Sequence, residues 1–489
     1  MKALPAAVAA AFCLAAASAQ TYEHVIITAG EFVAGFAPLG QYVEDELGLS
    51  DTTVTVEHIY ANYPGRDNAE RVRNFIRDAY SNWGTTHVLL GGDVDKVPSR
   101  DAFITITSRV PQESAYMACD LYFADLDGDW DADGDGKFGE LADSCDMYPD
   151  VHVGRVPAST IAEVGIYTGK FLTYSGHPNA PYLSRNLLTG FDLYDVPQVY
   201  MEHAMELYDT LYVPEHLRPS LKVYDSHTGD HRVATVSELA QGVNLWVHAD
   251  HGDRTNFKTG YLRHGWMVPA STLASLTNGD NLTTMLSAGC YIGDFTYSDC
   301  TGEVYIFNPA GGAVAVVANS SIGRLQGPDP LRGATMFMME HVVSGLVGQG
   351  NRGSFDGLTL ARAEAAAQVD TNTVLRWAVC EYNLLGEPAM PFWVPMGSGA
   401  SEKSEGRMQQ AEPWTPGVVR GMLFVSRAVG GKRSAVCAQL LDIAGRRVLD
   451  LAPGPNDVSG VTPGVYFVRG EGPRIQGSEG SSRKVTIQN

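Results

Sequence analysis

Two apolar runs of this chain end in side chains suited to nucleophilic and acid–base chemistry. The string WVHADHG ends at Gly252 and carries His251, and the string TTMLSAGC ends at Cys290. Both runs are typical of buried β-strands, and parallel strands in an α/β sheet bring their carboxyl ends to one edge, where ligands bind. A thiol and an imidazole at that edge are the parts of a nucleophile and its base. The pattern therefore predicts that Cys290 attacks a substrate and that His251 moves the proton.

The backbone around these residues suits a tetrahedral intermediate. The amides of Gly252 and Cys290 are candidates for an oxyanion hole, and glycine lets a carbonyl approach the backbone closely. A competing interpretation takes His248 and His251, with Asp250 and Asp253 nearby, as the ligands of a metal hydrolase. Residues three apart in an extended strand face opposite sides, which disfavours this metal pair.

Strands alternate with helices over most of the chain. This order predicts an α/β fold, with a mainly parallel sheet and helices on both of its faces. Asp67 and Glu70 predict a capping box at the start of one helix. We expect strands at 22–30, 53–60, 86–93, 150–157, 242–249, 282–289 and 311–320, and helices at 36–48, 72–83, 160–174, 196–212, 331–345 and 358–368.

The composition changes near residue 396. Residues 396–417 are rich in Ser, Gly, Glu and Pro, which predicts a flexible linker after a main domain at 20–395. Residues 418–489 contain short apolar runs separated by turn residues, which predicts a small all-β, sandwich-like module.

The first residues are typical of a secretory signal peptide. Met1 and Lys2 precede an apolar stretch that ends in the small residues Ala17, Ser18 and Ala19, so we expect a signal peptide at 1–19. We expect no transmembrane segment elsewhere. The net charge of −21 disfavours nucleic acid as a partner, because phosphate binding needs clustered Lys and Arg.

An acidic loop at 125–140, with the sequence DLDGDWDADGDGKFGE, predicts a structural calcium site. Its carboxylates repel one another unless a cation neutralises them, and oxygen ligands on a Gly-rich loop suit Ca²⁺. Counted from Asp129, the spacing follows the calcium loop of an EF-hand, although no helix pair clearly flanks it. The alternative is a solvated acidic loop. The candidate ligands are Asp127, Asp129, Asp131, Asp133, Asp135 and Glu140.

Six cysteines remain after the signal peptide, which is too few for a disulfide scaffold. Cys119 and Cys145 bracket a loop and are candidates for one disulfide. Cys380 lies in a helical pattern and is expected to be a packing residue.

Taken together, these motifs resemble those of the gingipain family of secreted bacterial cysteine peptidases. The matching strings are ANYPGRDNAERVRNFIRDAY, THVLLGGDVDKVPSR, the acidic loop, YPDVHVGRVPAS, WVHADHG, SAGCYIGDF, GGAVAVVANSS and YNLLGEPAMPFW. The resemblance implies a caspase-like fold, with Cys290 as nucleophile, His251 as base and the Gly252 and Cys290 amides as the oxyanion hole. It also implies that Asp150, just before the VHVGR strand, orients His251.

The resemblance does not carry over the preference of some gingipains for Arg or Lys. Glu163 is a weak candidate for an acid that would bind a basic substrate side chain, and its helical context favours a charge in the first turn of a helix.

The C-terminal module resembles the sorting domain of type IX secretion in Bacteroidetes-like bacteria. The matching strings are LLDIAGRRVLDL, GVTPGVYFVRG and RKVTIQN. This resemblance implies passage across an outer membrane with the type IX secretion machinery as partner, and a secreted or cell-surface location.

The sequence thus leads to one main hypothesis, a secreted, calcium-stabilised cysteine endopeptidase that hydrolyses proteins or peptides. Two alternatives remain, a non-catalytic cell-surface binding protein on the same fold and the metal hydrolase that uses His248 and His251.

Overall fold

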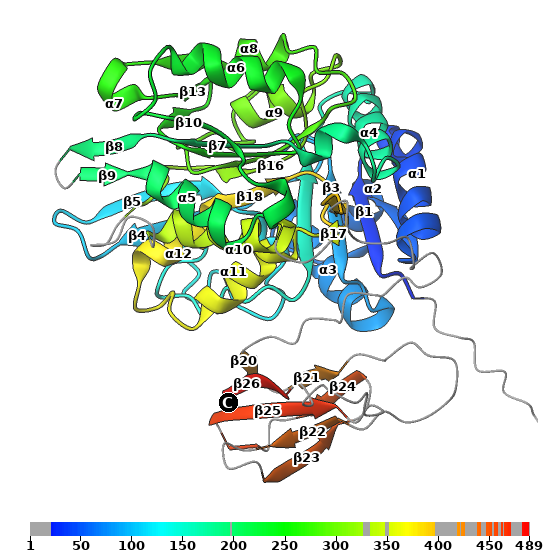
Figure 1. Cartoon of the computed structure of the whole chain (residues 1–489). Coiled ribbons are helices and arrows are strands. Elements are labelled where there is room, and N and C mark those ends of the chain that lie inside the picture. The colour runs from blue at the N-terminus through cyan, green and yellow to red at the C-terminus, as the bar shows by residue number, and fades with distance from the viewer. Residues whose placement is uncertain are drawn as a thin grey trace, which may run out of the picture.

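The computed structural model describes residues 21–195, 198–325, 333–347 and 352–396, and shorter stretches of the C-terminal module at 418–420, 422–425, 438–441, 446–451, 454–457, 461–462, 464–470 and 482–488 (Figure 1). The expected signal peptide and nearly all of the expected linker lie outside the described residues. Within the described residues, no helix has both the length and the apolar character needed to span a bilayer.

A ten-stranded sheet forms the centre of the main domain. Its strand order is β10-β7-β11-β15-β16-β18-β6-β3-β1-β2. In that order the strands are Leu221–Tyr224, Asn186–Gly190, Leu245–Ala249, Thr283–Ser287, Ala313–Asn319, Tyr382–Leu385, His152–Val156, His87–Gly91, His24–Thr28 and Asp51–Thr55.

The sheet consists of two parallel halves that meet at one antiparallel seam. Strands β10, β7, β11, β15 and β16 run in one direction, and β18, β6, β3, β1 and β2 run in the other. At the seam, β16 pairs antiparallel with β18, from Val316↔Leu385 to Asn319↔Tyr382. The carboxyl ends of β11, β15 and β16 therefore lie at the same edge as the amino end of β18.

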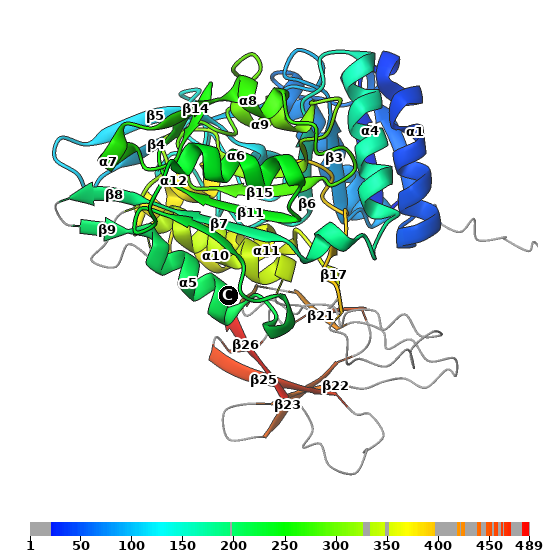
Figure 2. The same ribbon diagram turned by 45° about the horizontal axis from the view of Figure 1, so that its top comes forward.

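Helices cover both faces of this sheet (Figures 1 and 2). On one side of the first half lie α6 (His231–Gln241), α8 (Ala270–Ala274) and α9 (Thr301–Ile306), and on the other lie α5 (Met201–Leu211), α10 (Ala334–Val347), α11 (Asp356–Ala366) and α12 (Thr373–Glu381). The second half carries α1 (Val33–Tyr42), α2 (Val56–Asn62), α3 (Asn68–Trp83) and α4 (Ile161–Ser175), with α1 and α4 side by side. The predicted α/β fold with a mainly parallel sheet is confirmed.

Short hairpins and single turns complete the main domain. These elements are β4 (Asp101–Ile106) with β5 (Glu113–Ala118), β8 (Asp192–Asp195) with β9 (Gln198–Tyr200), β12 (Gly252–Asp253) with β13 (Asn256–Lys258) and β14 (Met267–Pro269), β17 (Arg352–Gly353) with β19 (Phe392–Trp393), and the short helix α7 (Tyr261–His264).

Local capping explains where several elements begin. Asp67 accepts the amide hydrogen of Glu70 at 2.9 Å at the start of α3, as the capping-box prediction requires. The Glu70 carboxylate, however, binds the amide of Arg66 rather than closing the box on Asp67. Glu163 closes a full capping box with Thr160 at the start of α4, so its carboxylate is committed to that helix.

Two stretches differ from the sequence-based expectation. Residues 53–60 were expected to form one strand, but β2 ends at Thr55, whose hydroxyl accepts the amide hydrogen of His58 at 3.2 Å and starts α2. The sequence also gave no sign of β18, because the helical pattern of α12 runs directly into it. A side-chain cap in the first case and strand pairing in the second override the local periodicity.

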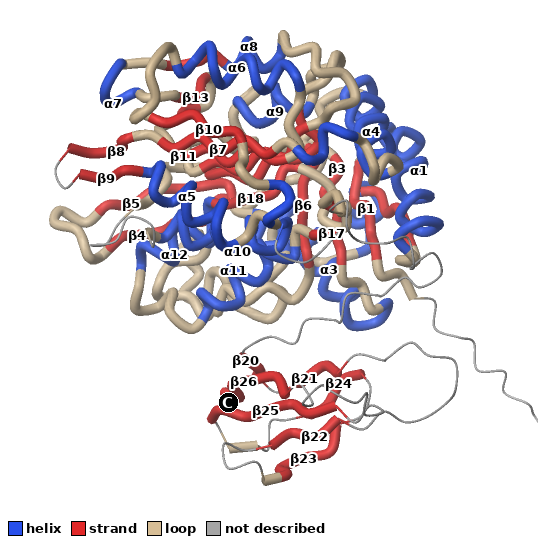
Figure 3. Tube along the Cα trace, viewed as in Figure 1, coloured by secondary structure: helices blue, strands red, loops and turns tan. Residues whose placement is uncertain are grey.

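The C-terminal module is all-β in its described residues (Figure 3). One sheet has the order β20-β26-β25-β22-β23, and β21 pairs with β24 in a second. These strands are Val418–Arg420, Ser482–Gln488, Gly464–Gly470, Ala438–Leu441 and Arg447–Leu451, then Met422–Val425 and Gly454–Asp457. The expected strands of this module are therefore present.

Candidate active site

Neighbouring strands carry His251 and Cys290 to the same edge of the sheet. Strands β11 and β15 pair in parallel, and His248 stands opposite Ser287 at the end of the pairing. The amide of Ala288 donates to the carbonyl of His248 at 2.9 Å, which fixes this register. Because His251 and Cys290 each follow three residues after that matched pair, they leave the sheet at the same level.

The two loops that follow these strands pack backbone against backbone. A Cβ atom placed on Gly252 would lie 2.7 Å from Cδ1 of Ile292 and 3.2 Å from the carbonyl oxygen of Cys290. A Cβ atom on Gly289 would lie 3.3 Å from Cα of Gly252. A side chain at 252 would therefore require Ile292 and the Cys290 backbone to move, and the close approach brings the His251 loop onto the Cys290 turn.

The exit of β16 holds the Cys290 turn from the other side. Asn319 donates from Nδ2 to the carbonyl of Ala288 at 3.0 Å, and the amide of Tyr291 donates to the carbonyl of Ser321 at 2.8 Å. Tyr291 has φ 57°, a left-handed conformation that is uncommon outside glycine. The residue after the thiol thus adopts a backbone conformation that these contacts support.

Burial and a nearby carboxylate keep the Cys290 thiol protonated. They raise its pKa to about 11, with burial the larger cause and Glu381 the second. The amides of Gly323 and of Cys290 itself hydrogen-bond the sulfur and act in the opposite direction. Glu381 is fully buried at the end of α12, and the indole Nε1 of Trp377 donates to it at 3.1 Å.

The imidazole of His251 is neutral in the same environment. Burial lowers its pKa, while a hydrogen bond to the carbonyl of Leu193 opposes this shift. The rings of Tyr194 and Tyr261 meet the imidazole edge-on, with centroids 6.1 and 5.6 Å away. The thiol and the imidazole at this edge are therefore both in their neutral forms.

Asp250 organises the loop that carries His251, and the sequence analysis gave it no such role. One carboxylate oxygen accepts the amide hydrogen of His251 at 2.6 Å, and the other accepts those of Gly260 at 2.6 Å and Tyr261 at 3.2 Å. Burial raises its pKa to about 7 against the effect of these three donors. Its position next to His251 is the only sequence signal for this role.

His248 has no nitrogen left for a metal. Its Nδ1 lies 2.8 Å from the hydroxyl of Ser287, and its Nε2 lies 2.8 Å from the carbonyl of Lys258. The side chain is fully buried, and burial lowers its pKa to about 4. The structure therefore makes His248 a satisfied core residue and does not support the metal-hydrolase alternative.

Asp150 lies with other carboxylates. Its Oδ2 accepts the amide hydrogen of Leu126 at 2.8 Å, and its oxygens cluster with those of Asp125 and Asp127 within 4.8 Å. Burial, with Asp127 and Asp146 as further causes, raises the pKa of Asp150 to about 6. The hydrogen bond at His251 involves Leu193, so the orienting role of Asp150 stays a prediction that these contacts do not support.

The acidic loop gathers its carboxylates into two further clusters that share Asp133. Asp131 and Asp133 converge with Asp143, and Asp133 also converges with Asp135 and Glu140, each set within 4.8 Å. The carboxylate of Asp129 instead accepts the amide hydrogen of Asp131 at 3.2 Å. Asp143, three residues beyond the predicted loop, was missed because the calcium-loop spacing ends at Glu140.

The candidate disulfide does not form, since Cys119 and Cys145 are free thiols. The sulfur of Cys145 lies 3.2 Å from a guanidinium nitrogen of Arg376. Cys380 is fully buried, as expected for a packing residue. Among the described cysteines, Cys290 is the one that is not buried.

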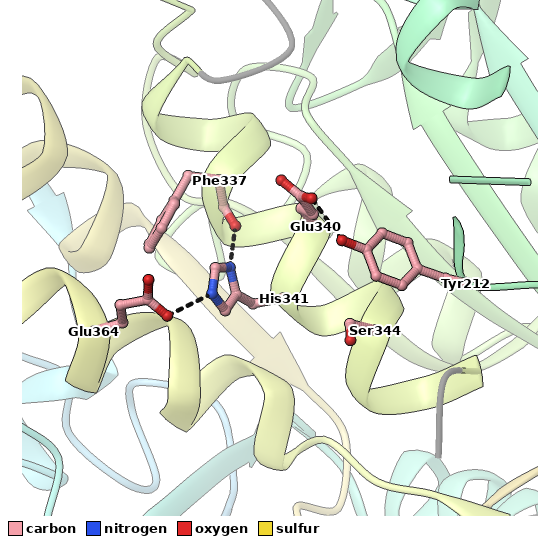
Figure 4. A pocket seen from close by; sticks show the side chains of 6 residues that line it. All are labelled: Tyr212, Phe337, Glu340, His341, Ser344 and Glu364. Carbon is pink, nitrogen blue, oxygen red and sulfur yellow. Dashed lines mark hydrogen bonds and ion pairs between the residues drawn. The ribbon is translucent and has the colours of Figure 1, made fainter. Parts of the chain in front are cut away.

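A cavity of about 320 Å³ lies away from His251 and Cys290, between α10, α11 and the end of α5 (Figure 4). Its central side chain, His341, is hydrogen-bonded to the carbonyl of Phe337 at 2.9 Å and to Glu364 at 3.0 Å. The lining residues are Tyr212, Phe337, Glu340, His341, Ser344 and Glu364. None of the predicted catalytic residues contributes to this cavity.

Fold and site together define an α/β protein with a cysteine–histidine pair at the carboxyl edge of its sheet. The model of Peptidase family C25 matches residues 17–393, and the chain therefore belongs to this family of cysteine peptidases.

Solved structures agree at the level of the fold. The crystal structure of the Arg-specific cysteine proteinase gingipain R shares 15% identity with a TM-score of 0.57, covering 96% of this chain and 98% of that one. The complex of the pro- and mature domains of the Porphyromonas gingivalis enzyme RgpB shares 14% identity with a TM-score of 0.56, covering 95% and 100%. A search of curated protein sequences gives no significant match.

We predict that iodoacetamide modifies Cys290 in the native protein before Cys119, Cys145, Cys300 or Cys380, because those four thiols are buried. Since the thiolate is the reactive form and the pKa is raised to about 11, the rate should climb steadily between pH 7 and pH 10. Peptide mass spectrometry after timed labelling measures both the order in which the cysteines are modified and the pH dependence of the rate at Cys290. A rate already at its plateau at pH 7 would mean a thiolate–imidazolium pair and contradict the neutral pair.

Proposed function

We propose that this protein is a secreted cysteine endopeptidase in which Cys290 and His251 form the catalytic pair. The observation that carries the proposal is the backbone contact between Gly252 and the Cys290 turn. This contact places the loop that carries the imidazole beside a partly exposed thiol.

In the proposed mechanism, the sulfur of Cys290 attacks the scissile carbonyl while His251 accepts the thiol proton. The amides of Gly252 and Cys290 stabilise the oxyanion, and His251 then delivers the proton to the leaving amine. A water molecule, deprotonated by His251, hydrolyses the resulting thioester. The Leu193 carbonyl holds the imidazole in one orientation through these steps.

Cys290→Ala should lower kcat/KM for peptide hydrolysis by roughly 10⁴-fold or more, because the nucleophile is lost. His251→Ala should lower kcat/KM to a similar level, since the two residues act as a unit. The matched control is Cys300→Ala, which removes a fully buried thiol outside the proposed machinery and should keep most of the activity.

A fluorogenic peptide library with purified protein measures these rates. Cleavage by Cys290→Ala at the wild-type rate would refute the mechanism. A wild-type protein that is folded and cleaves none of the library would favour the non-catalytic binding protein instead.

We also propose that the acidic loop binds structural calcium. The proposal is supported by two clusters of carboxylates, both of which contain Asp133 and consist mainly of the predicted ligands. Gly134 and Gly136 have φ of 74° and 82°, so the loop turns where the calcium-loop pattern places flexible residues. Burial raises the pKa of Glu140 and of Asp143, so their ionised forms are destabilised in the loop. A bound cation would stabilise these ionised forms.

Calcium should raise the melting temperature of chelated protein, because binding to the folded state alone stabilises it by about 2.7 kcal/mol at a hundredfold excess over Kd. Asp133→Asn should lose most of this response, since it removes a ligand from both clusters. Asp280→Asn, an exposed carboxylate outside the loop, is the control and should respond like wild type. If Ca²⁺ leaves the melting temperature of the wild type unchanged, the loop is a solvated acidic segment.

Export is the third part of the proposal. The signal-peptide pattern at 1–19 and the all-β module at 418–489 support secretion to the cell surface with the type IX machinery as partner. The main domain contains both members of the catalytic pair, so export and catalysis are assigned to separate parts of the chain.

A truncated chain that ends at Met396 should therefore stay active as purified protein but accumulate in the periplasm of a host with type IX secretion. Immunodetection in periplasmic and surface fractions, alongside a peptide assay, separates the two outcomes. Normal surface levels of the truncated chain would contradict the sorting role. Loss of peptidase activity in the purified protein would mean that the C-terminal module belongs to the catalytic unit.

A further inference from the structure

A second cluster of ionisable side chains lies outside the proposed catalytic pair. Asp225 follows the edge strand β10, His231 begins α6 and His264 ends α7. Their ligand atoms all lie within 4.8 Å of one another. The three residues come from separate elements, so only the tertiary fold brings them together.

The distances in this cluster are longer than hydrogen bonds. Oδ1 of Asp225 lies 3.6 Å from Nδ1 of His231 and 3.9 Å from Nε2 of His264. With metal–ligand bonds of about 2.0–2.2 Å, two ligands of a tetrahedral zinc ion lie about 3.3–3.5 Å apart. The separations from Asp225 exceed this spacing by a few tenths of an ångström, and the two histidine nitrogens lie within 4.8 Å of each other, so modest side-chain shifts would let all three bind one ion.

Two of the three ligand atoms are buried without a hydrogen bond. Oδ1 of Asp225 and Nδ1 of His231 have no such partner among the described residues, and the side chain of His231 is 2% exposed. Nε2 of His231 lies 3.0 Å from the carbonyl of His227, which only accepts, so Nε2 carries the ring proton. In the neutral ring, Nδ1 then turns a lone pair towards a carboxylate, an arrangement that a cation between them would stabilise.

Gly260 keeps the centre of the cluster open. A Cβ atom on this residue would lie 2.9 Å from Oδ1 of Asp225, 3.2 Å from Nδ1 of His231 and 3.3 Å from Cδ2 of His264. The space that a side chain would fill is thus bordered by the same three groups. Gly260 has φ 93°, so a larger residue would also be strained there.

Further contacts orient the ligands. Oδ2 of Asp225 accepts the amide hydrogen of Asp192 at 2.7 Å, and the ring of His264 stacks on Trp266 with centroids 3.9 Å apart. Such outer contacts are usual around metal ligands because they fix the ring and carboxylate orientations. The side chain of His264 is 38% exposed, which leaves room for water as a fourth ligand.

We propose that Asp225, His231 and His264 bind one Zn²⁺ ion, with water in the remaining position. A set of two imidazoles and one carboxylate suits zinc, whereas calcium takes only oxygen ligands. This site is separate from the proposed calcium loop and does not depend on the peptidase assignment.

The zinc site adjoins the loop that carries His251. Gly260 borders the metal position, and its amide donates to the same Asp250 carboxylate that accepts the amide hydrogen of His251. Tyr261, the next residue, packs its ring against the imidazole of His251. Bound zinc would therefore restrain the segment that supports the proposed base.

Zinc binding is tested in the full chain carrying Cys290→Ala, which removes the partly exposed thiol as a competing ligand, with Ca²⁺ present to saturate the acidic loop. Titration against a chromophoric chelator should give one tight Zn²⁺ per chain. Co²⁺ in place of zinc should give the intense visible absorption of a tetrahedral site. His264→Ala and Asp225→Asn should each weaken zinc binding by at least about 100-fold.

The matched control is His87→Ala. His87 belongs to the other described cluster of two histidines and one aspartate, with His152 and Asp356, so its loss should leave the tight zinc ion in place. Circular dichroism checks that each variant is folded, and the exposed position of His264 makes its variant the least disruptive. Tight zinc retained in His264→Ala, lost in His87→Ala, or absent from the parent protein would each overturn the proposal.

Discussion

The register between β11 and β15 is the constraint on which the site depends. His248 stands opposite Ser287, and the chain continues for three residues on each side before it reaches His251 and Cys290. A shift of one of these strands by one residue would turn its side chains to the other face of the sheet and put His251 and Cys290 at different levels of the edge. His248 donates to the Lys258 carbonyl and accepts from the Ser287 hydroxyl, and these two hydrogen bonds hold the register from inside the sheet.

The remaining parts of the site come from the neighbouring strand exits. The chain after β7 supplies the Leu193 carbonyl, and the chain after β16 supplies the Gly323 amide. The antiparallel seam adds Glu381, because β18 begins at the edge where β16 ends. Four adjacent parallel strands and one reversed strand thus place the proposed base, its hydrogen-bond partner, the proposed nucleophile and a buried acid at one edge.

Burial sets the chemistry of this edge. It raises the pKa of Cys290 and lowers the pKa of His251, so both groups are neutral before substrate binds. The Gly323 amide at the sulfur favours the thiolate but does not outweigh burial and Glu381. In the proposed mechanism, the charge forms only during attack and meets hydrogen-bond donors that are already fixed in place.

Much of this protein was determined by its sequence alone. Apolar runs that stop at His251 and Cys290, and strands that alternate with helices, were enough to predict the fold class and the edge where these residues meet. Local hydrogen bonds were harder to predict from the sequence. Thr55 caps α2 and so ends β2, but the alternating pattern of residues 53–60 gives no sign of that cap. Contacts between segments far apart in the chain could not be predicted from the sequence.

Asp150 is the clearest case of what only the tertiary structure decided. Its place before β6 is evident from the sequence, but its carboxylate lies with Asp125 and Asp127 because the chain after β5 folds back against it. The proposed zinc ligands Asp225, His231 and His264 have no common spacing that marks them. The order of residues along a strand is local and follows from side-chain periodicity, whereas the meeting of separate strand and helix ends depends on the packing of the whole domain.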